Sequence, residues 1–457
     1  MTEARRKALR CFVAGGYLIA LCAWVVASAC SVDIVEAIYD GHADALAGVR
    51  VRTETSRGAE IPIRFYQARF DGLLNAAIVV STGLSLLAIG LLSRVTWLRV
   101  AASNLAIVVF LAAGAEIGMR TLGFEYERIA RTGLTDRGVW SYDATRGWFH
   151  RPNATGHSYL GGPDQGTIWI NSLGLRDREV TLAKPEGVKR ILVFGDSYVF
   201  GVGVDHQNLF TTRLQALLDE NPGQRFEVIN LGVSGYSTDQ EYLLFREFGV
   251  QLDPDAIVLV VCQNDPGANI RDVAYARYYK PYFAFDDAGE LRLGNAEVPQ
   301  LTHWQRVKVW LSQESELWNF LRSRRSEVAP VQAVLNFFRV AVPSVTGDDP
   351  IAITAAILRR FADEAEAMGV PMLVTTTAGS AGVDDDRGSM RIADAELFSR
   401  LSDAPITWLD LWPVLIRARD ANPKKYWDFD PNQHWNVDAH RVAAEAVYRR
   451  LRTSGML

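Results

Sequence analysis

The chain has 457 residues and a formal net charge of −5 at pH 7. A single hydrophobic core seldom grows beyond about 250 to 300 residues, so we expect more than one structural unit. The chain is acidic and lacks the excess of basic residues that is typical of nucleic-acid-binding proteins, so that class is excluded. The four cysteines have the spacing of neither a zinc site nor a disulfide framework.

Three apolar segments in the first part of the chain are long enough to cross a bilayer, which takes about 20 residues. They are residues 11–30, 73–92 and 100–119. A cleaved signal peptide is the alternative for the first segment, because the basic stretch 5–10 precedes it. Buried core helices are the alternative for the other two. We predict a membrane region with three transmembrane helices over residues 1–120.

The distribution of positive charge predicts the orientation of these spans, because basic residues favour the cytoplasmic side. Basic residues precede the first span, and Arg94 and Arg99 lie between the second and the third. Five arginines in the 31–70 loop oppose this pattern, but acidic residues are interspersed among them. With the N-terminus inside, three spans place everything after residue 119 outside the cytoplasm.

The remaining sequence changes character twice. Residues 121–189 are dense in Gly, Asn and Asp and predict turns and short strands. From residue 190 onward, strand-like and helical patterns alternate, which predicts a doubly wound α/β domain over 190–457 with ligands at the carboxyl ends of its parallel strands. An aromatic-rich stretch at about 272–344 breaks the alternation and is interpreted as an insertion over that edge. The expected strands are 190–195, 226–232, 256–262, 371–377 and 406–411.

The first of these strands ends in Gly-Asp-Ser, which places Ser197 at a sharp turn before a helix. Such a turn exposes a nucleophilic hydroxyl at the top of a sheet, although a serine that only caps the helix is the alternative. The next two strand ends read "NLGVSGYSTDQE" and "VVCQNDPGAN". Backbone amides at Ser197 and Gly235, with the side chain of Asn264, could therefore bind a developing oxyanion.

A general base is also required, and His434 lies just before an amphipathic helical pattern near the C-terminus. Its imidazole could accept the Ser197 proton, while a nearby carboxylate fixes its tautomer. Metal ligation is the rival role for His434, but no cluster with ligand spacing accompanies it, so neither a metal nor a cofactor is expected. His440, on the helix itself, is interpreted as structural.

Four stretches, "FGDSYVFGVGV", "NLGVSGYST", "CQND" and "DPNQHWN", resemble the blocks of the SGNH or GDSL hydrolase superfamily in their order. "WINSLGLRDRE" is similar to the segment before the nucleophile in bacterial membrane-anchored members. The resemblance covers about residues 190–451 and implies a flavodoxin-like three-layer sandwich that works without a metal. It implies that Ser197 is the nucleophile and first oxyanion donor, with Gly235 and Asn264 as further donors and His434 as the base.

The sequence departs from the family pattern at two places. In the third block, Cys262 stands where the family usually has glycine. The family's acid usually stands three residues before the base, a position occupied here by Pro431. Asp430 and Asp428 are the nearest substitutes. We favour Asp430 as the acid, because Pro431 biases it toward an extended conformation in which its carboxylate can curl back toward His434.

These observations lead to one functional hypothesis and two alternatives. The main hypothesis is a membrane-anchored serine esterase of the bacterial inner membrane, whose extracytoplasmic domain cleaves acyl esters, chiefly acetyl esters, of cell-envelope glycans. The first alternative is an O-acyltransferase that moves acetyl groups onto an envelope polysaccharide. The second is a catalytically silent scaffold of a polysaccharide export system, but such a scaffold is expected to lose a block residue, and all four are present.

Overall fold

The structure is a computed structural model, and it forms two compact units. One comprises Met1–Tyr126 with Glu314–Val328, and the other comprises Glu127–Gln313 with Ala329–Leu457. The structure describes residues 3–29, 77–121, 139–157, 167–220, 223–274, 278–323, 348–377, 389–421 and 434–457, with further gaps at 91, 94, 304, 308–310 and 312–314.

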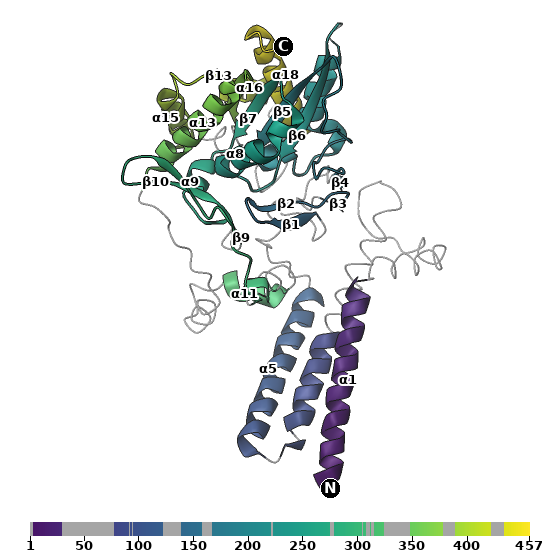
Figure 1. Cartoon of the computed structure of the whole chain (residues 1–457). Coiled ribbons are helices and arrows are strands. Elements are labelled where there is room, and N and C mark those ends of the chain that lie inside the picture. Colours follow the sequence, from purple (N-terminus) through teal and green to yellow (C-terminus); the bar gives the residue numbers. More distant parts are fainter. Residues whose placement is uncertain are drawn as a thin grey trace, which may run out of the picture. The chain divides into compact units, whose positions relative to one another are not determined.

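Helices form the described part of the first unit (Figure 1). The Tyr17 hydroxyl lies 2.9 Å from Thr82 Oγ1, which joins the first two helices. A Cβ added at Gly83 would lie 2.9 Å from the Phe110 ring, so the second and third helices approach closely there. The helices are α1 (Glu3–Ala29), the helix Ala77–Gly90, α5 (Thr96–Thr121) and α11 (Glu316–Ser323).

One described helix is long and apolar enough to cross a membrane. It is the 24-residue stretch Thr96–Met119 of α5, of which little is buried inside the protein. The described helix within the second predicted span, Ala77–Gly90, is apolar but shorter. The prediction of three spans therefore stays a prediction.

A five-stranded parallel sheet forms the centre of the second unit. Its strand order is β13-β12-β7-β5-β6, so the first strand of the domain, β5, lies between β7 and β6. Each of the five strands expected from the sequence is present. They are β5 (Val188–Gly195), β6 (Arg225–Gly232), β7 (Ala256–Val261), β12 (Met372–Thr376) and β13 (Ile406–Leu409).

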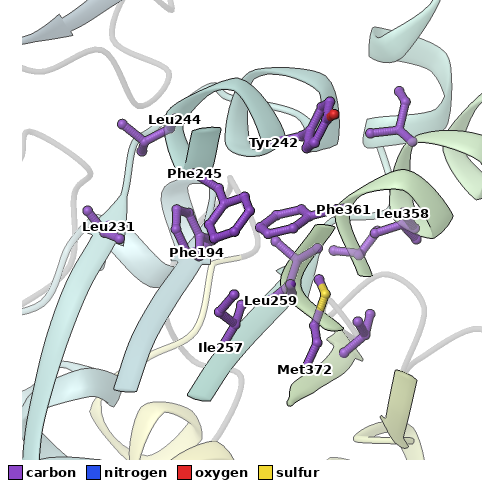
Figure 2. Close-up of a cluster of buried hydrophobic side chains, with 14 of the residues drawn as sticks. Phe194, Leu231, Tyr242, Leu244, Phe245, Ile257, Leu259, Leu358, Phe361 and Met372 are labelled. Atoms are coloured by element: carbon purple, nitrogen blue, oxygen red, sulfur yellow. The ribbon is translucent and has the colours of Figure 1, made fainter. Parts of the chain in front are cut away.

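Helices cover both faces of this sheet. Successive residues of a strand point to opposite faces, so each strand contributes side chains to two separate cores. Ile191 and Val193 pack on the side of α7, α16 and α18, whereas Leu192 and Phe194 pack on the side of α8, α13 and α15. Figure 2 shows the core on the side of α8, α13 and α15, in which Phe361 stacks on Phe245. The predicted three-layer α/β sandwich is thus confirmed. The helices are α7 (Phe210–Asp219), α8 (Thr238–Glu247), α13 (Pro350–Ala367), α15 (Ser389–Arg400), α16 (Trp412–Ala421) and α18 (Val437–Thr453).

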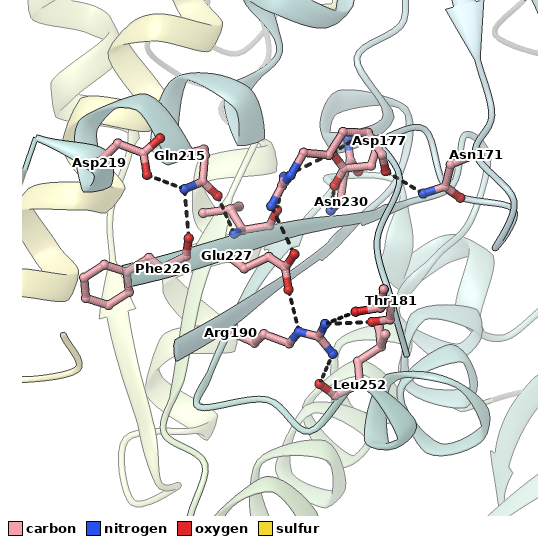
Figure 3. A network of polar contacts seen from close by, with 12 residues as sticks. Asn171, Asp177, Thr181, Arg190, Gln215, Asp219, Phe226, Glu227, Asn230 and Leu252 are labelled. Atoms are coloured by element: carbon pink, nitrogen blue, oxygen red, sulfur yellow. Dashed lines mark hydrogen bonds and ion pairs between the residues drawn. The ribbon is translucent and has the colours of Figure 1, made fainter. Parts of the chain in front are cut away.

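A polar network ties the amino end of the sheet to the chain around it (Figure 3). The Arg190 side chain is fully buried, and its Nε donates to Glu227 Oε2 on β6 at 2.6 Å. Its two terminal nitrogens donate to the carbonyls of Thr181 and Leu252 at 2.7 and 3.0 Å. A buried charge is stable only when it is paired and hydrogen-bonded, and Arg190 meets both conditions.

Most of the remaining described secondary-structure elements are short strands and 3₁₀ turns. The predicted short strands between 121 and 189 are present, and similar short strands begin the aromatic-rich insertion. Residues 314–328, which lie inside the insertion in sequence, belong to the first unit. These elements are β1 (Trp140–Asp143), β2 (Gly147–His150), β3 (Thr155–His157), β4 (Thr167–Trp169), β8 (Val273–Ala274), β9 (Tyr278–Tyr279), β10 (Tyr282–Phe285), β11 (Leu291–Gly294), and the 3₁₀ turns His206–Asn208 and Gly249–Leu252.

Candidate active site

Ser197 begins a short helix, α6 (Ser197–Phe200), immediately after β5. Asp196 starts this helix, because its side chain accepts a hydrogen bond from the backbone N–H of Tyr198 at 2.9 Å. The end of β6 lies against the same helix, where a Cβ at Gly232 would be only 2.4 Å from the backbone nitrogen of Phe200. Glycine is therefore required at 232, and the close approach holds Ser197 at the carboxyl edge of the sheet.

His434 reaches this edge from the segment before α18. Its neighbour Trp435 is buried, and the indole N–H donates to the carbonyl of Thr377, just beyond β12, at 2.9 Å. The His434 ring packs on the Tyr198 ring with a centroid separation of 5.0 Å. Two anchored neighbours therefore fix the position of the imidazole.

The two predicted catalytic side chains meet. Nε2 of His434 lies 2.8 Å from Oγ of Ser197, which is within the range for proton transfer between a hydroxyl and an imidazole. When Nε2 accepts that hydrogen bond, the neutral ring carries its proton on Nδ1. A serine hydroxyl bonded in this way can lose its proton to the imidazole as it attacks an electrophilic carbon.

The other predicted residues lie on the loops that follow the strands on either side of β5. Gly235 follows β6 and has φ of +81°, a left-handed conformation that favours glycine. Asn264 follows β7, is exposed, and does not cap α9 (Asp265–Asn269) with its side chain. The strand order brings these loops beside Ser197. Asp430 and Asp428 lie outside the described residues, so the choice between them stays a prediction.

Arg176 is a buried residue for which the sequence analysis predicted no role. Its side chain is 1% exposed, and Nη1 donates to the carbonyl of Phe200 at 2.7 Å. Nη2 donates to the carbonyl of Val204 at 2.6 Å, and the guanidinium lies over the Phe200 ring. Arg176 thus fixes the chain that leaves α6. Its only signal in the sequence is its place in the segment "WINSLGLRDRE".

A buried ion pair braces the loops that carry Gly235 and Asn264. Lys280, from the insertion, is 1% exposed and pairs with Asp239 at the start of α8. The Lys280 ammonium also donates to the carbonyl of Ala268 in α9 at 3.1 Å. Lys280 therefore connects α8 with α9. The sequence pattern could not reveal this pairing, because the partners are 41 residues apart.

A second buried carboxyl, Asp265, joins the same two loops. One oxygen accepts hydrogen bonds from the Thr238 hydroxyl and the Cys262 backbone N–H, both at 3.0 Å. Burial, followed by the charge of Asp196, raises the pKa of Asp265 well above its usual range. Burial and Asp265 do the same for the pKa of Glu241. Among the described residues, no three His, Cys, Asp or Glu side chains form a group that could hold a metal ion.

His440 has the structural role that the sequence predicted. It is buried, and its Nδ1 accepts a hydrogen bond from the backbone N–H of Phe210 at 3.0 Å, which links α18 to α7. Burial, helped by the positive charge of Arg176, lowers the pKa of His440 to about 3. Because an unfolded histidine has a pKa near 6.5, the unfolded chain binds a proton below that pH that the folded protein does not.

We expect His440→Asn to reduce the loss of unfolding free energy as the pH falls below neutrality. The wild-type protein should lose about 2 kcal/mol through this histidine between pH 7.5 and pH 5, and the variant should not. Asparagine can still accept the Phe210 N–H. Buried carboxyls such as Glu241 act in the opposite direction, since their raised pKa favours the folded state as pH falls. The measurement is therefore the difference between variant and wild type in urea unfolding of the full chain in detergent. If the unfolding free energies of variant and wild type changed in parallel with pH, the prediction would be wrong.

The fold and the Ser–His contact together define a class. A serine bonded to an imidazole at the carboxyl edge of a parallel sheet is the arrangement of enzymes that transfer acyl groups through a serine. Residues 193–442, more than half of the chain, match the model of the GDSL-like Lipase/Acylhydrolase family. The chain belongs to this family and is a serine ester hydrolase with the SGNH hydrolase fold. The resemblance of the sequence to the SGNH or GDSL hydrolase superfamily is confirmed.

Other comparisons add similar solved structures. An acetylxylan esterase from Geobacillus stearothermophilus, Axe2, is 14% identical, with 57% of this chain and 94% of Axe2 covered and a TM-score of 0.33. TesA is 14% identical, with 59% and 100% covered and a TM-score of 0.34. A GDSL-like lipase from Bacteroides thetaiotaomicron is 14% identical, with 58% and 89% covered and a TM-score of 0.32. No curated protein matches the sequence.

Proposed function

We propose that the protein is a membrane-anchored serine esterase. It removes acyl groups, chiefly acetyl, that are ester-linked to glycans of the bacterial cell envelope. The observation that carries the esterase chemistry is the 2.8 Å contact between Ser197 Oγ and His434 Nε2. A scaffold without activity has no need of this contact, of the glycine at 232, or of the buried residues that hold the surrounding loops. The intact site therefore disfavours the silent alternative.

In the proposed mechanism, Ser197 Oγ attacks the ester carbonyl carbon while His434 accepts the hydroxyl proton. The tetrahedral oxyanion is bound by the backbone N–H groups of Ser197 and Gly235 and by the side-chain amide of Asn264. Its collapse breaks the ester bond, and His434 returns the proton to the departing sugar oxygen. A water molecule, deprotonated by His434, then attacks the acyl-serine and releases the acid and the free serine.

Asn264→Ala should lower kcat by roughly 10² to 10³ if its amide binds the oxyanion. The side chain is exposed and does not cap α9, so its removal should leave folding intact. Gln263→Ala, one residue earlier, is the matched control and should stay within a few-fold of the wild type. Turnover of a chromogenic acetate ester measures both. An unchanged kcat in a folded Asn264 variant would remove this residue from the site.

Asp430→Asn should lower kcat at least tenfold and by up to about 10⁴, because an orienting carboxylate holds the imidazole in its catalytic tautomer. Asp428→Asn is the matched control, since its side chain is separated from His434 by two further residues. The same ester assay compares the two variants. A larger loss in the Asp428 variant would shift the assignment by two residues, and full activity in both would leave a Ser–His dyad.

The membrane anchoring proposed here is supported by the surface of α5. Within its apolar stretch Thr96–Met119 only Ala102 and Ala106 are buried inside the protein, and Leu105, Val108 and Leu111 expose more than half of their surface. An apolar surface of this extent is stable when lipid covers it. We propose a membrane region over 1–120 that crosses the inner membrane three times. A connecting segment at 121–189 and an extracytoplasmic hydrolase domain at 190–457 follow it.

The glycan substrate and the fate of the acyl group can be tested together. The full chain in detergent is incubated with an acetylated envelope oligosaccharide and an unacetylated acceptor, with Ser197→Ala as the blank. We expect free acetate to form faster than acetylated acceptor. The reverse would favour the O-acyltransferase. Release of acetate from a small ester but not from the oligosaccharide would reject the glycan as the substrate and leave the esterase activity supported.

A further inference from the structure

The helix α11 belongs by sequence to the insertion of the hydrolase domain but packs on α5 in the first unit. Figure 1 shows it across the C-terminal end of α5. The contact is specific. One carboxylate oxygen of Glu116 on α5 accepts hydrogen bonds from the Ser315 hydroxyl and from the backbone N–H of Leu317, both at 2.9 Å.

These hydrogen bonds begin α11. The Ser315 hydroxyl oxygen also accepts the backbone N–H of Trp318 at 3.0 Å, as a helix-capping serine does. Glu116 thus binds two donors at the start of an eight-residue helix, where backbone N–H groups lack partners within the helix and negative charge is favoured. A glutamate near the end of an apolar span is costly unless it is hydrogen-bonded, and α11 supplies the donors.

The position of Glu116 along α5 gives the depth of this contact. Glu116 lies 20 residues after Thr96, a rise of about 30 Å, which equals the thickness of a bilayer's hydrocarbon core. If Thr96 lies near one boundary of that core, Glu116 and the start of α11 lie at the other. The side chains described in α11 are apolar and half-buried, and they are Leu317, Trp318, Phe320 and Leu321.

We propose that α11 is an interfacial helix whose apolar surface lies against the lipids of the membrane, held there by Glu116. Tryptophan at this depth fits, because its ring is stable at the boundary between headgroups and acyl chains. The inference rests on the proposed membrane anchoring of α5. Its consequence is a second attachment, since the chain leaves the hydrolase unit after Gln313, enters the membrane unit, and returns at Ala329.

The full chain in vesicles of phosphatidylethanolamine and phosphatidylglycerol tests this contact. The vesicles contain a small fraction of phosphatidylcholine with a photoactivatable diazirine on its acyl chain. Mass spectrometry then maps the residues that are cross-linked after illumination. We expect cross-links on α5 and on Leu317–Leu321. Cross-links on α5 with none on α11 would overturn the inference and leave the membrane anchoring intact. Absence of cross-links on both would overturn the anchoring and the inference with it.

Two variants separate the role of Glu116 from a general disturbance. Glu116→Ala removes the acceptor, so cross-linking of α11 should fall at least fivefold while that of α5 is unchanged. Glu116→Gln keeps an amide oxygen that can accept the Leu317 N–H, and it should retain most of the α11 cross-links. Both variants should hydrolyse a small soluble ester at the wild-type rate, which verifies folding. Equal cross-linking of α11 in wild type and Glu116→Ala would overturn the proposed role of Glu116.

Discussion

Ser197→Ala is expected to lower kcat for small acetate esters by about 10⁶, which corresponds to about 8 kcal/mol of lost transition-state stabilisation. The reason is that the substitution removes the hydroxyl that is hydrogen-bonded to His434 and on which the acyl-enzyme is expected to form. The serine lies at the turn between β5 and α6, and its hydroxyl is 2.8 Å from the imidazole. Alanine removes the nucleophile, but it leaves the turn, its Asp196 cap and the surrounding core in place.

Ser237→Ala is the matched control for this experiment. Ser237 is also buried near the carboxyl edge of the sheet, and its hydroxyl donates to Asp239 at 2.8 Å. Its loss removes one hydrogen bond of the loop, so kcat should stay within about tenfold of the wild type. A fluorophosphonate probe should label the wild type and the Ser237 variant, and should fail to label the Ser197 variant. A Ser197→Ala protein with a tenth of wild-type turnover would reject the serine mechanism.

The sequence predicted the sheet and the Ser–His pair because both depend on local patterns. Runs such as Ile191–Phe194 are apolar at every position, which only a strand buried on both faces explains in an alternating α/β pattern. The carboxyl ends of parallel strands meet at one edge, so residues that follow Gly195 and Gly232 had to be neighbours. Their convergence with His434 followed from the family resemblance and from the amphipathic helix after it.

The supporting residues could not be predicted, because their roles depend on contacts between distant segments. Nothing in the sequence around Lys280 indicates that it enters the domain to meet Asp239. The arginine at 176 is likewise indistinguishable from a surface residue until the carbonyls of Phe200 and Val204 accept its hydrogen bonds. The pairing of Glu116 with α11 joins segments about 200 residues apart. Burial of a charge is a property of the fold, and sequence patterns report only which surfaces are apolar.

His434→Gln is expected to lower kcat by about as much as Ser197→Ala, roughly 10⁶, because the serine is a poor nucleophile without a base. Glutamine can place an amide near the position of the imidazole Nε2 and so preserve the contact with Ser197. It cannot take up the proton at neutral pH. His440→Asn is the matched control on the same C-terminal segment, and it should change stability while kcat in the folded protein stays within a few-fold.

The double variant Ser197→Ala with His434→Gln should be no slower than either single variant. The two residues act as one unit, so the second substitution removes nothing that the first has left working. Independent contributions would multiply to a loss of about 10¹², which exceeds the rate enhancement of many enzymes. The residual rate of all three variants should then reflect the oxyanion donors and substrate binding alone, and adding Asn264→Ala to the double variant should lower it further. A double variant that is at least tenfold slower than both single variants would show that His434 assists hydrolysis by a route that does not pass through Ser197.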